Sequence, residues 1–153
     1  MSAIIERIRA YPEKGAAGLE LEEGQLIENM GLSGDRHAHG GERQLSLFFA
    51  ESRELLAINR EKALCLSRFR ENITIRGMTG PGAISPALEA GALLEAGNTI
   101  LEITGETKRC HDECKLHEMG ERCSLAGMNL FAKVRKGGII RKGDRICKIE
   151  ETI

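Results

Sequence analysis

Residues 43–50 read RQLSLFFA and give the strongest strand prediction in the chain. A short run of aliphatic and aromatic residues of this kind favours a β-strand. In the residues that follow, 51–63, Leu55, Leu56 and Ile58 lie near the spacing of one helical face, with no Gly or Pro between them. A strand that leads directly into a helix is therefore predicted here.

Further short strands are predicted on both sides of this unit. Residues 71–77 alternate Ile73 and Ile75 with polar neighbours, and residues 93–107 place a Gly-Asn turn between two apolar runs. The other expected elements are a strand in residues 3–11, a short strand between glycine-marked turns in 18–35, a short helix in 127–137 and a strand in 141–151. This pattern predicts a mainly β domain with a few short helices (α+β), arranged as a barrel or a curled sheet.

Length and charge narrow the class of protein. The 153 residues fit a single domain, 1–153, and the 22 basic residues balance 23 acidic ones to a net charge of -1. That balance argues against nucleic acid or a membrane surface as a partner. No secretory signal or long apolar segment is found, so the chain is expected to be cytoplasmic, with its five cysteines reduced.

Residues 108–123, KRCHDECKLHEMGERC, concentrate the chemistry-bearing side chains. If this segment is helical, Cys110, Cys114 and His117 lie on one face, and Cys123 could complete a tetrahedral zinc site. A second cysteine pair of matching spacing, which the strong form of a zinc signature requires, is missing. Structural zinc is therefore one hypothesis for this cluster.

A reactive thiol is the second hypothesis. Cys110 directly follows Lys108 and Arg109 at an expected strand-to-helix junction, and neighbouring cations favour a thiolate. The acidic Asp112, Glu113 and Glu118 would raise the pKa of the thiol if they lay close to the sulfur.

The third hypothesis treats cysteines as small buried apolar side chains. It applies to Cys114 and Cys123 as an alternative to zinc binding. For Cys65 and Cys147, which stand alone among apolar residues, it is the prediction.

A second group of candidate binding residues lies in residues 31–48, GLSGDRHAHGGERQLSLF. This glycine-rich loop could bind an anion or a pterin-like heterocycle through backbone N–H groups together with Arg36 and Arg43. On a strand, His37 and His39 would share a face and could bind a metal ion. The alternative is a plain hairpin connection whose charges are solvated.

Four segments in this order resemble the MOSC domain, the family named after the C-terminal domain of molybdenum cofactor sulfurase. They are residues 31–47, 69–77, 96–110 and 131–146, so the resemblance runs from about Gly31 to Ile149. Within the family the chain is most similar to small stand-alone bacterial members. Their cysteine pattern and Phe-Ala-x-Val segment match Cys110, His111, Cys114, Cys123 and residues 131–134.

The resemblance implies a barrel-like β fold linked to molybdenum cofactor biosynthesis or sulfuration. It also implies a cysteine, Cys110 or Cys114, that carries persulfide sulfur or binds the molybdenum of a pterin cofactor. The expected partners are a pyridoxal-phosphate-dependent cysteine desulfurase or other proteins that make or accept the molybdenum cofactor. Whether the chain is an enzyme stays open, with sulfur transfer and molybdenum-cofactor-dependent redox activity as the two enzymatic alternatives.

The resemblance also assigns residues to roles. Asp35 is expected mainly to fix the loop, Glu71 and Asn72 to brace the pocket, and Gly143 with Asp144 to form a turn. The residues expected to bind the cofactor are Gly34, Asp35, Arg36, Arg43, Gln44, Asn72, Lys108 and Arg109. The chain departs from the family pattern in having Arg109 where many members have proline, and residues 124–126 where close members carry Met-Pro. A non-catalytic module stabilised by zinc remains the alternative function.

Overall fold

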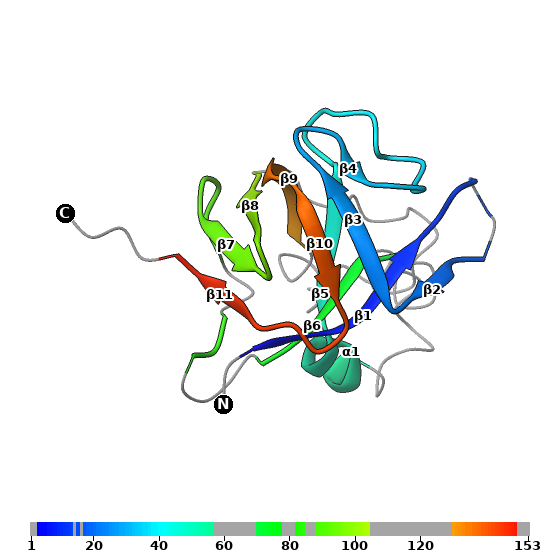
Figure 1. Ribbon diagram of the computed structural model, residues 1–153. Coiled ribbons are helices and arrows are strands. Elements are labelled where there is room, and N and C mark those ends of the chain that lie inside the picture. Colours follow the sequence, from blue (N-terminus) through cyan, green and yellow to red (C-terminus); the bar gives the residue numbers. More distant parts are fainter. Residues whose placement is uncertain are drawn as a thin grey trace, which may run out of the picture.

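A computed structural model describes residues 3–13, 15, 17–56, 70–77, 82–84, 88–104 and 130–149. The elements in chain order are β1 (Ile4–Ala10), β2 (Leu19–Leu21), β3 (Glu23–Ile27), β4 (Gly31–Leu32), β5 (Leu45–Phe49), α1 (Ala50–Leu56), β6 (Ile73–Arg76), β7 (Leu93–Ala96), β8 (Thr99–Ile103), β9 (Leu130–Lys136), β10 (Gly138–Arg141) and β11 (Ile146–Lys148). Figure 1 shows these strands curling around a common centre, with α1 at one end.

Eight of the strands form one sheet in the order β11-β7-β8-β9-β5-β6-β1-β2, and β10-β3-β4 form a smaller sheet. Strands β5 and β6 are parallel, whereas the other described pairs are antiparallel. A parallel pair cannot be joined by a tight hairpin, so the chain leaves β5 through α1 before it returns to β6.

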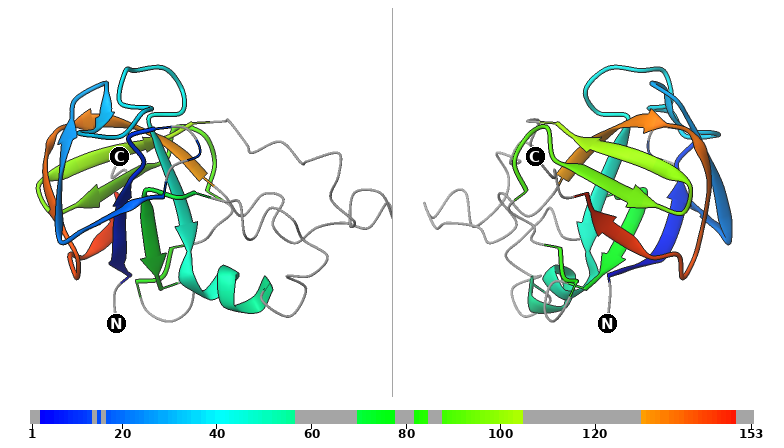
Figure 2. Two further views of the ribbon diagram at one scale, coloured as in Figure 1. Left: turned by 90° about the vertical axis from the view of Figure 1, so that its right-hand side faces the viewer. Right: turned by 60° about the vertical axis from the view of Figure 1, so that its left-hand side comes forward.

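The large sheet closes on itself where β1 meets the chain segment that enters β11. Ile146 N donates to Ala3 O at 3.0 Å, and Ile5 N donates to Asp144 O at 2.9 Å. A bridge between Ile4 and Arg145 lies between these two bonds. Strands β11 to β1 therefore form a closed ring, visible in the two views of Figure 2, with β2 attached outside it.

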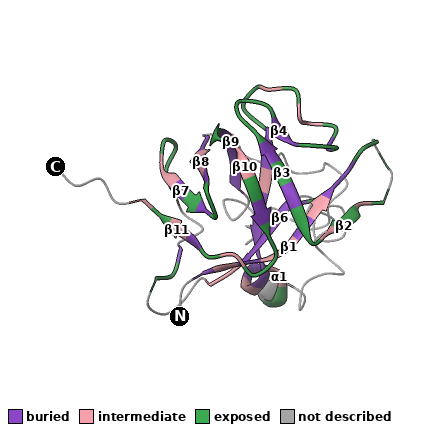
Figure 3. Ribbon diagram, viewed as in Figure 1, coloured by how far each residue is buried: buried purple, intermediate pink, exposed green. Residues whose placement is uncertain are grey.

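The core fills the inside of this ring. Along β5, Leu45 and Leu47 point inward, and Ile73 and Ile75 do the same from the neighbouring β6. The smaller sheet contributes Leu26, Leu32 and Ile140 to the same cluster. Figure 3 shows the buried residues following the strands, while exposed residues concentrate in the turns.

Three aromatic side chains are buried without belonging to this central cluster. Phe48 on β5, Phe131 on β9 and Tyr11 just after β1 are all less than a tenth exposed. Their strand neighbours Leu47 and Ala132 belong to the core, so the alternation of a strand places Phe48 and Phe131 on the outer face of the sheet. This outer face carries the candidate site.

The expected mainly β, barrel-like fold is confirmed. So are the strands predicted in residues 3–11, 43–50, 71–77 and 141–151, the hairpin in residues 93–107, and the turn at Gly143, where Asp144 N donates back to Arg141 O at 3.0 Å. Residues 18–35 hold three strands instead of the one expected. The predicted helix 51–63 is described as far as Leu56 and lies outside the described residues beyond that point.

The prediction of a helix in residues 127–137 is wrong for residues 130–136, which form β9. Three consecutive residues, from Leu130 to Ala132, are buried, because Leu130 faces the core and Phe131 is covered on the outside. An apolar run of this kind hides the alternation of a strand and imitates helical spacing.

Two further findings concern single features. Cys147 is partly exposed, so the expectation that it is fully buried is wrong. None of the helices in the described residues is long and apolar enough to cross a membrane. The assignment of residues 1–153 to one domain stays a prediction.

The closed ring predicts that alanine substitutions at two leucines change the free energy of unfolding by very different amounts. Leu47 is fully buried at the centre of β5, whereas Leu19 at the outer β2 is 55% exposed. We expect Leu47→Ala to lower the free energy of unfolding by about 2–5 kcal/mol, because it leaves a cavity in the core. Leu19→Ala, the matched control, should change it by less than about 0.5 kcal/mol in urea unfolding. Equal losses would contradict the described core.

Candidate functional site

A row of residues runs across consecutive strands on the outer face of the barrel, and we call it the site row. It consists of Thr104, Phe131, Ser46, Asn72 and Arg9. Backbone hydrogen bonds hold the row in register: Thr104 N donates to Phe131 O, Asn72 N to Ser46 O, and Arg9 N to Asn72 O, at 2.8–2.9 Å. The row brings together positions from residue 9 to residue 131.

Asn72 is the hub of this row, and its side chain is buried. Its Oδ1 accepts a hydrogen bond from Ser46 N at 3.0 Å, and its Nδ2 donates to Arg9 O at 3.1 Å and to Asp35 Oδ1 at 3.0 Å. One amide therefore links β1, β5 and the glycine-rich loop.

Asp35 fixes the glycine-rich loop to the barrel, as expected for it. Its buried carboxylate accepts hydrogen bonds from Tyr11 N at 2.8 Å and His37 N at 3.0 Å, in addition to the bond from Asn72. Hydrogen bonding of both carboxylate oxygens compensates the cost of burying the charge. We call the Asp35–Asn72 pair the latch.

Gln44 anchors the other end of the loop. It is fully buried; its Oε1 accepts from Val134 N at 2.9 Å, and its Nε2 donates to Gly41 O at 3.0 Å. The polar atoms of Asp35, Gln44 and Asn72 thus bond to the protein itself. Direct cofactor contacts by these three residues remain a prediction.

Part of the loop backbone is already hydrogen-bonded within the protein, and anion binding by the remaining N–H groups stays a prediction. Successive N–H groups bond internally: Asp35 N to Leu32 O, Arg36 N to Tyr11 O, and Ala38 N to Asp35 O. Gly34 has a φ of +90° and open space around its Cα, so a ligand can approach the backbone there. The N–H groups of Asp35, Arg36 and Ala38 are therefore engaged within the protein.

Three arginines stack on the three aromatic rings of the outer face. The guanidinium of Arg43 lies 4.9 Å from the ring centre of Phe131, that of Arg70 lies 5.5 Å from Tyr11, and that of Arg53 lies 5.2 Å from Phe48. We call these three pairs the arginine–aromatic face. Stacking uses the face of a guanidinium, whereas its N–H donors lie in the plane and point to the sides. Each of these contacts helps to fix the position of an arginine on the outer face.

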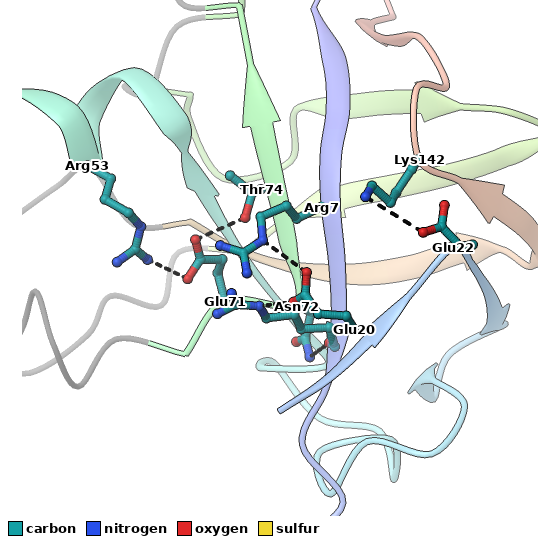
Figure 4. Close-up of polar contacts among 9 residues, drawn as sticks. Arg7, Glu20, Glu22, Arg53, Glu71, Asn72, Thr74 and Lys142 are labelled. Atoms are coloured by element: carbon teal, nitrogen blue, oxygen red, sulfur yellow. Dashed lines mark hydrogen bonds and ion pairs between the residues drawn. The ribbon is translucent and has the colours of Figure 1, made fainter. Parts of the chain in front are cut away.

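Glu71 positions one of these arginines. Its buried carboxylate accepts from Arg53 Nη2 at 2.6 Å and from Thr74 Oγ1 at 3.0 Å, as Figure 4 shows. The Arg53–Glu71 pair links α1 to the start of β6, while the expectation that Glu71 braces a cofactor pocket stays a prediction.

His37 and His39 lie near each other, with ring centres 6.5 Å apart. Burial and the neighbouring Arg36 lower the pKa of His37, while Asp35, whose Oδ2 lies 3.6 Å from His37 Nδ1, acts against this shift. No group of three or more potential metal ligands occurs in the part of the chain that the structure describes. The two histidines therefore do not form a metal site with described partners.

The segment that carries the cysteine cluster lies outside the described residues. It contains Lys108, Arg109, Cys110, Cys114, His117 and Cys123. Its points of attachment are described: Thr104 and Leu130 stand at the site row, next to Phe131. Cys110 follows Thr104 by six positions in the sequence.

Sequence reasoning missed four members of this face: Tyr11, Phe48, Arg53 and Arg70. Arg70 and Tyr11 lie far apart in the sequence, and Arg53 and Phe48 belong to different secondary-structure elements, so no local motif marks either pair. The only available hint was that Arg70 directly precedes the Glu-Asn pair at residues 71–72.

A family model described as the MOSC domain matches residues 34–147, which is most of the chain. The closed β barrel with its loop at residues 33–44 is thus the fold of a known class of protein. The chain belongs to the MOSC domain family, whose context is molybdenum cofactor sulfurase chemistry.

Solved structures share this fold. The YuaD protein from Bacillus subtilis is 18% identical with a TM-score of 0.68, and the match covers 95% of this chain and 94% of that one. YiiM from Escherichia coli is 16% identical with a TM-score of 0.63, covering 98% of this chain and 69% of that one. YiiM from Geobacillus stearothermophilus is 14% identical with a TM-score of 0.65, covering 97% and 75%. No curated protein matches the chain.

The hub role of Asn72 can be tested by removing its amide. We expect Asn72→Ala to lower the free energy of unfolding by at least about 2 kcal/mol, because Ser46 N, Arg9 O and Asp35 all lose a buried partner. Gln25→Ala removes an exposed amide on β3 and should cost less than about 0.5 kcal/mol. Urea unfolding of both variants measures the difference, and a neutral Asn72→Ala would contradict the hub.

The environment of His37 predicts a titration. Its pKa should lie below the ordinary value of about 6.5 when followed by NMR of the imidazole ring. Arg36→Gln should raise that pKa, because it removes a neighbouring positive charge. A base whose pKa is lowered by folding binds protons more readily when unfolded, so His37 should destabilise the fold as the pH drops below about 6.5. A His37 pKa above 6.5 would refute this environment.

Proposed function

We propose that this chain binds the molybdenum cofactor, a pyranopterin phosphate, or carries sulfur for it, with Cys110 or Cys114 as the working thiol. The observation that supports the proposal most is the position of the arginine–aromatic face. Phe131, which stacks with Arg43, is hydrogen-bonded to Thr104, the last described residue before the cysteine cluster. The proposal therefore assigns anion binding to this face and sulfur chemistry to the segment that follows Thr104 in the sequence.

The side chains of this face suit a pterin phosphate. Arg43 and Arg70 are exposed and stacked, and a planar guanidinium binds phosphate through two parallel hydrogen bonds. A Cβ added at Gly34 or Gly41 would meet no atom within 4 Å, so the loop backbone is accessible at these two positions. Molybdenum, when bound, would supply the redox and sulfur-exchange chemistry, and this chain would supply the anion-binding side chains and the thiol ligand.

Sulfur transfer to the chain needs only a thiolate. The Sγ of Cys110 attacks the outer sulfur of a persulfide on a cysteine desulfurase, the S–S bond of the donor breaks, and the donor cysteine leaves as a thiolate. The chain then carries a persulfide, and no external oxidant is consumed. Lys108 and Arg109 beside Cys110 would favour its thiolate form.

This proposal makes the chain a sulfur transferase or a cofactor carrier of the cytoplasm. Its partners would be a pyridoxal-phosphate-dependent cysteine desulfurase and the proteins that make or accept the cofactor. The alternative, a zinc-stabilised module with ligands among Cys110, Cys114, His117 and Cys123, is separated from it by the same experiment.

The test is an anaerobic native mass spectrum of the wild type and of Cys110→Ser and Cys114→Ser. Each protein is measured as purified, after incubation with a desulfurase and cysteine, and after mixing with molybdenum cofactor. We expect a sulfur or cofactor adduct on the wild type that one of the two variants loses completely, because only a thiolate accepts sulfane sulfur.

Cys147→Ser is the matched control, since Cys147 lies in β11 and should leave the adduct unchanged. Stoichiometric zinc in every sample, no adduct in any, and unfolding on addition of a chelator would refute the proposal in favour of the zinc module.

A further inference from the structure

We infer that two copies of this chain pair through strand β2 as a two-fold dimer, with Leu19 of one copy opposite the partner's Leu19. The surface consists of Gly18, Leu19 and Glu20, and we call it the β2 edge. Strand β2 ends the large sheet and lies outside the closed ring, at the margin of the molecule in Figure 1. The inference is independent of the proposed function.

Glu20 directs its backbone groups away from the protein. Arg9 lies opposite Glu20 in the β1–β2 pair, yet Arg9 N donates to Asn72 O at 2.8 Å and Arg9 O accepts from Asn72 Nδ2 at 3.1 Å. In an antiparallel pair, opposed residues that bond each other alternate with opposed residues that do not. Arg9 and Glu20 form a pair of the second kind, so the N–H and C=O of Glu20 point outward.

Gly18 has the same orientation as Glu20. The register of β1 and β2, continued by one residue, places Gly18 opposite Tyr11. Tyr11 N donates to Asp35 Oδ1, and Tyr11 O accepts from Arg36 N, so neither group bonds to Gly18. Among the described residues, Gly18 and Glu20 have no backbone hydrogen-bond partner. A strand edge with such groups can pair with a strand of another molecule.

One antiparallel register of two copies uses all of these groups. With Leu19 on the two-fold axis, Glu20 lies opposite the partner's Gly18, and the reverse. Each of these two pairs exchanges two backbone hydrogen bonds, and the Leu19 pair between them is of the non-bonded kind, whose side chains approach most closely. Leu19 is 55% exposed, so this contact removes a large apolar side chain from water.

The charges of the edge favour the same register. Glu20 forms ion pairs with Arg7 and Arg9, so cations of its own copy accompany its carboxylate. The two Glu20 side chains take diagonal positions, about 7–8 Å apart, and each faces a glycine. A register that placed Glu20 opposite the partner's Glu20 would instead bring like charges together. The edge is therefore complementary to itself, which identifies a second copy of the chain as its occupant.

The size of the β2 edge sets the strength of the dimer. Three residues from each copy are far fewer than the roughly 20–30 residues a side of a standard interface. We therefore expect a reversible dimer whose population rises with protein concentration.

The first test is sedimentation equilibrium of the reduced full chain over a hundredfold range of concentration. We expect the weight-average mass to rise from 16.8 kDa toward twice that value. Leu19→Lys places two like charges opposite each other on the axis and should weaken the dimer at least about fivefold. Ile139→Lys changes a partly exposed isoleucine on β10, away from the edge, and should leave the dimer unchanged. Urea unfolding at low concentration checks that both variants are folded.

The second test fixes the register by cross-linking Leu19→Cys. The Cα atoms of a non-bonded antiparallel pair lie about 4.5 Å apart, within the range that a disulfide requires. With oxidised glutathione as the oxidant, we expect an intermolecular disulfide between the two substituted positions, identified by peptide mass mapping. Wild type shows the background from the native cysteines, and Ile139→Cys is the matched control for random collision.

Three results would overturn the inference. They are a mass of one copy throughout the concentration range, a dimer that Leu19→Lys leaves intact, and cross-linking of Leu19→Cys no greater than that of Ile139→Cys.

Discussion

The side-chain amide of Asn72 is the interaction on which the outer face of the barrel depends. It satisfies a backbone N–H of β5 and a backbone carbonyl of β1, and it also bonds the carboxylate of Asp35. Because amide and carboxylate are both buried, loss of either leaves the other without compensation. A change that disturbs the strand pairing around Asn72 is therefore expected to displace the glycine-rich loop as well, and the reverse.

The candidate site depends on these hydrogen bonds and contains no residue of the hydrophobic core. The core residues point into the barrel, whereas the arginines lie over aromatic side chains on its outer face. Side chains on the outer face can therefore be substituted with little effect on core packing, while the strands hold their backbone positions in place. A barrel of this kind can support different ligands within one family without repacking its interior.

Prediction from the sequence succeeded where a single physical preference acted locally. Alternation identified β6, the Gly-Asn turn identified the β7–β8 hairpin, and the loop chemistry of Asp35 identified its role as an acceptor. It failed at β9, where burial on both faces removed the alternation. It could not find Arg70 on Tyr11, because that contact exists only once segments distant in sequence lie side by side. It also missed Arg53 on Phe48, because that contact depends on how α1 packs beside β5.

The closure of the ring by β1 and the segment that enters β11 has a consequence for biosynthesis. The backbone N–H of Ile5 can bond to Asp144 O only after nearly the whole described chain has been synthesised. Until then the apolar inner face of β1 lacks one of its neighbours, and contacts so distant in sequence also slow folding. The β7–β8 hairpin, whose contacts are local, can therefore form before the ring is complete.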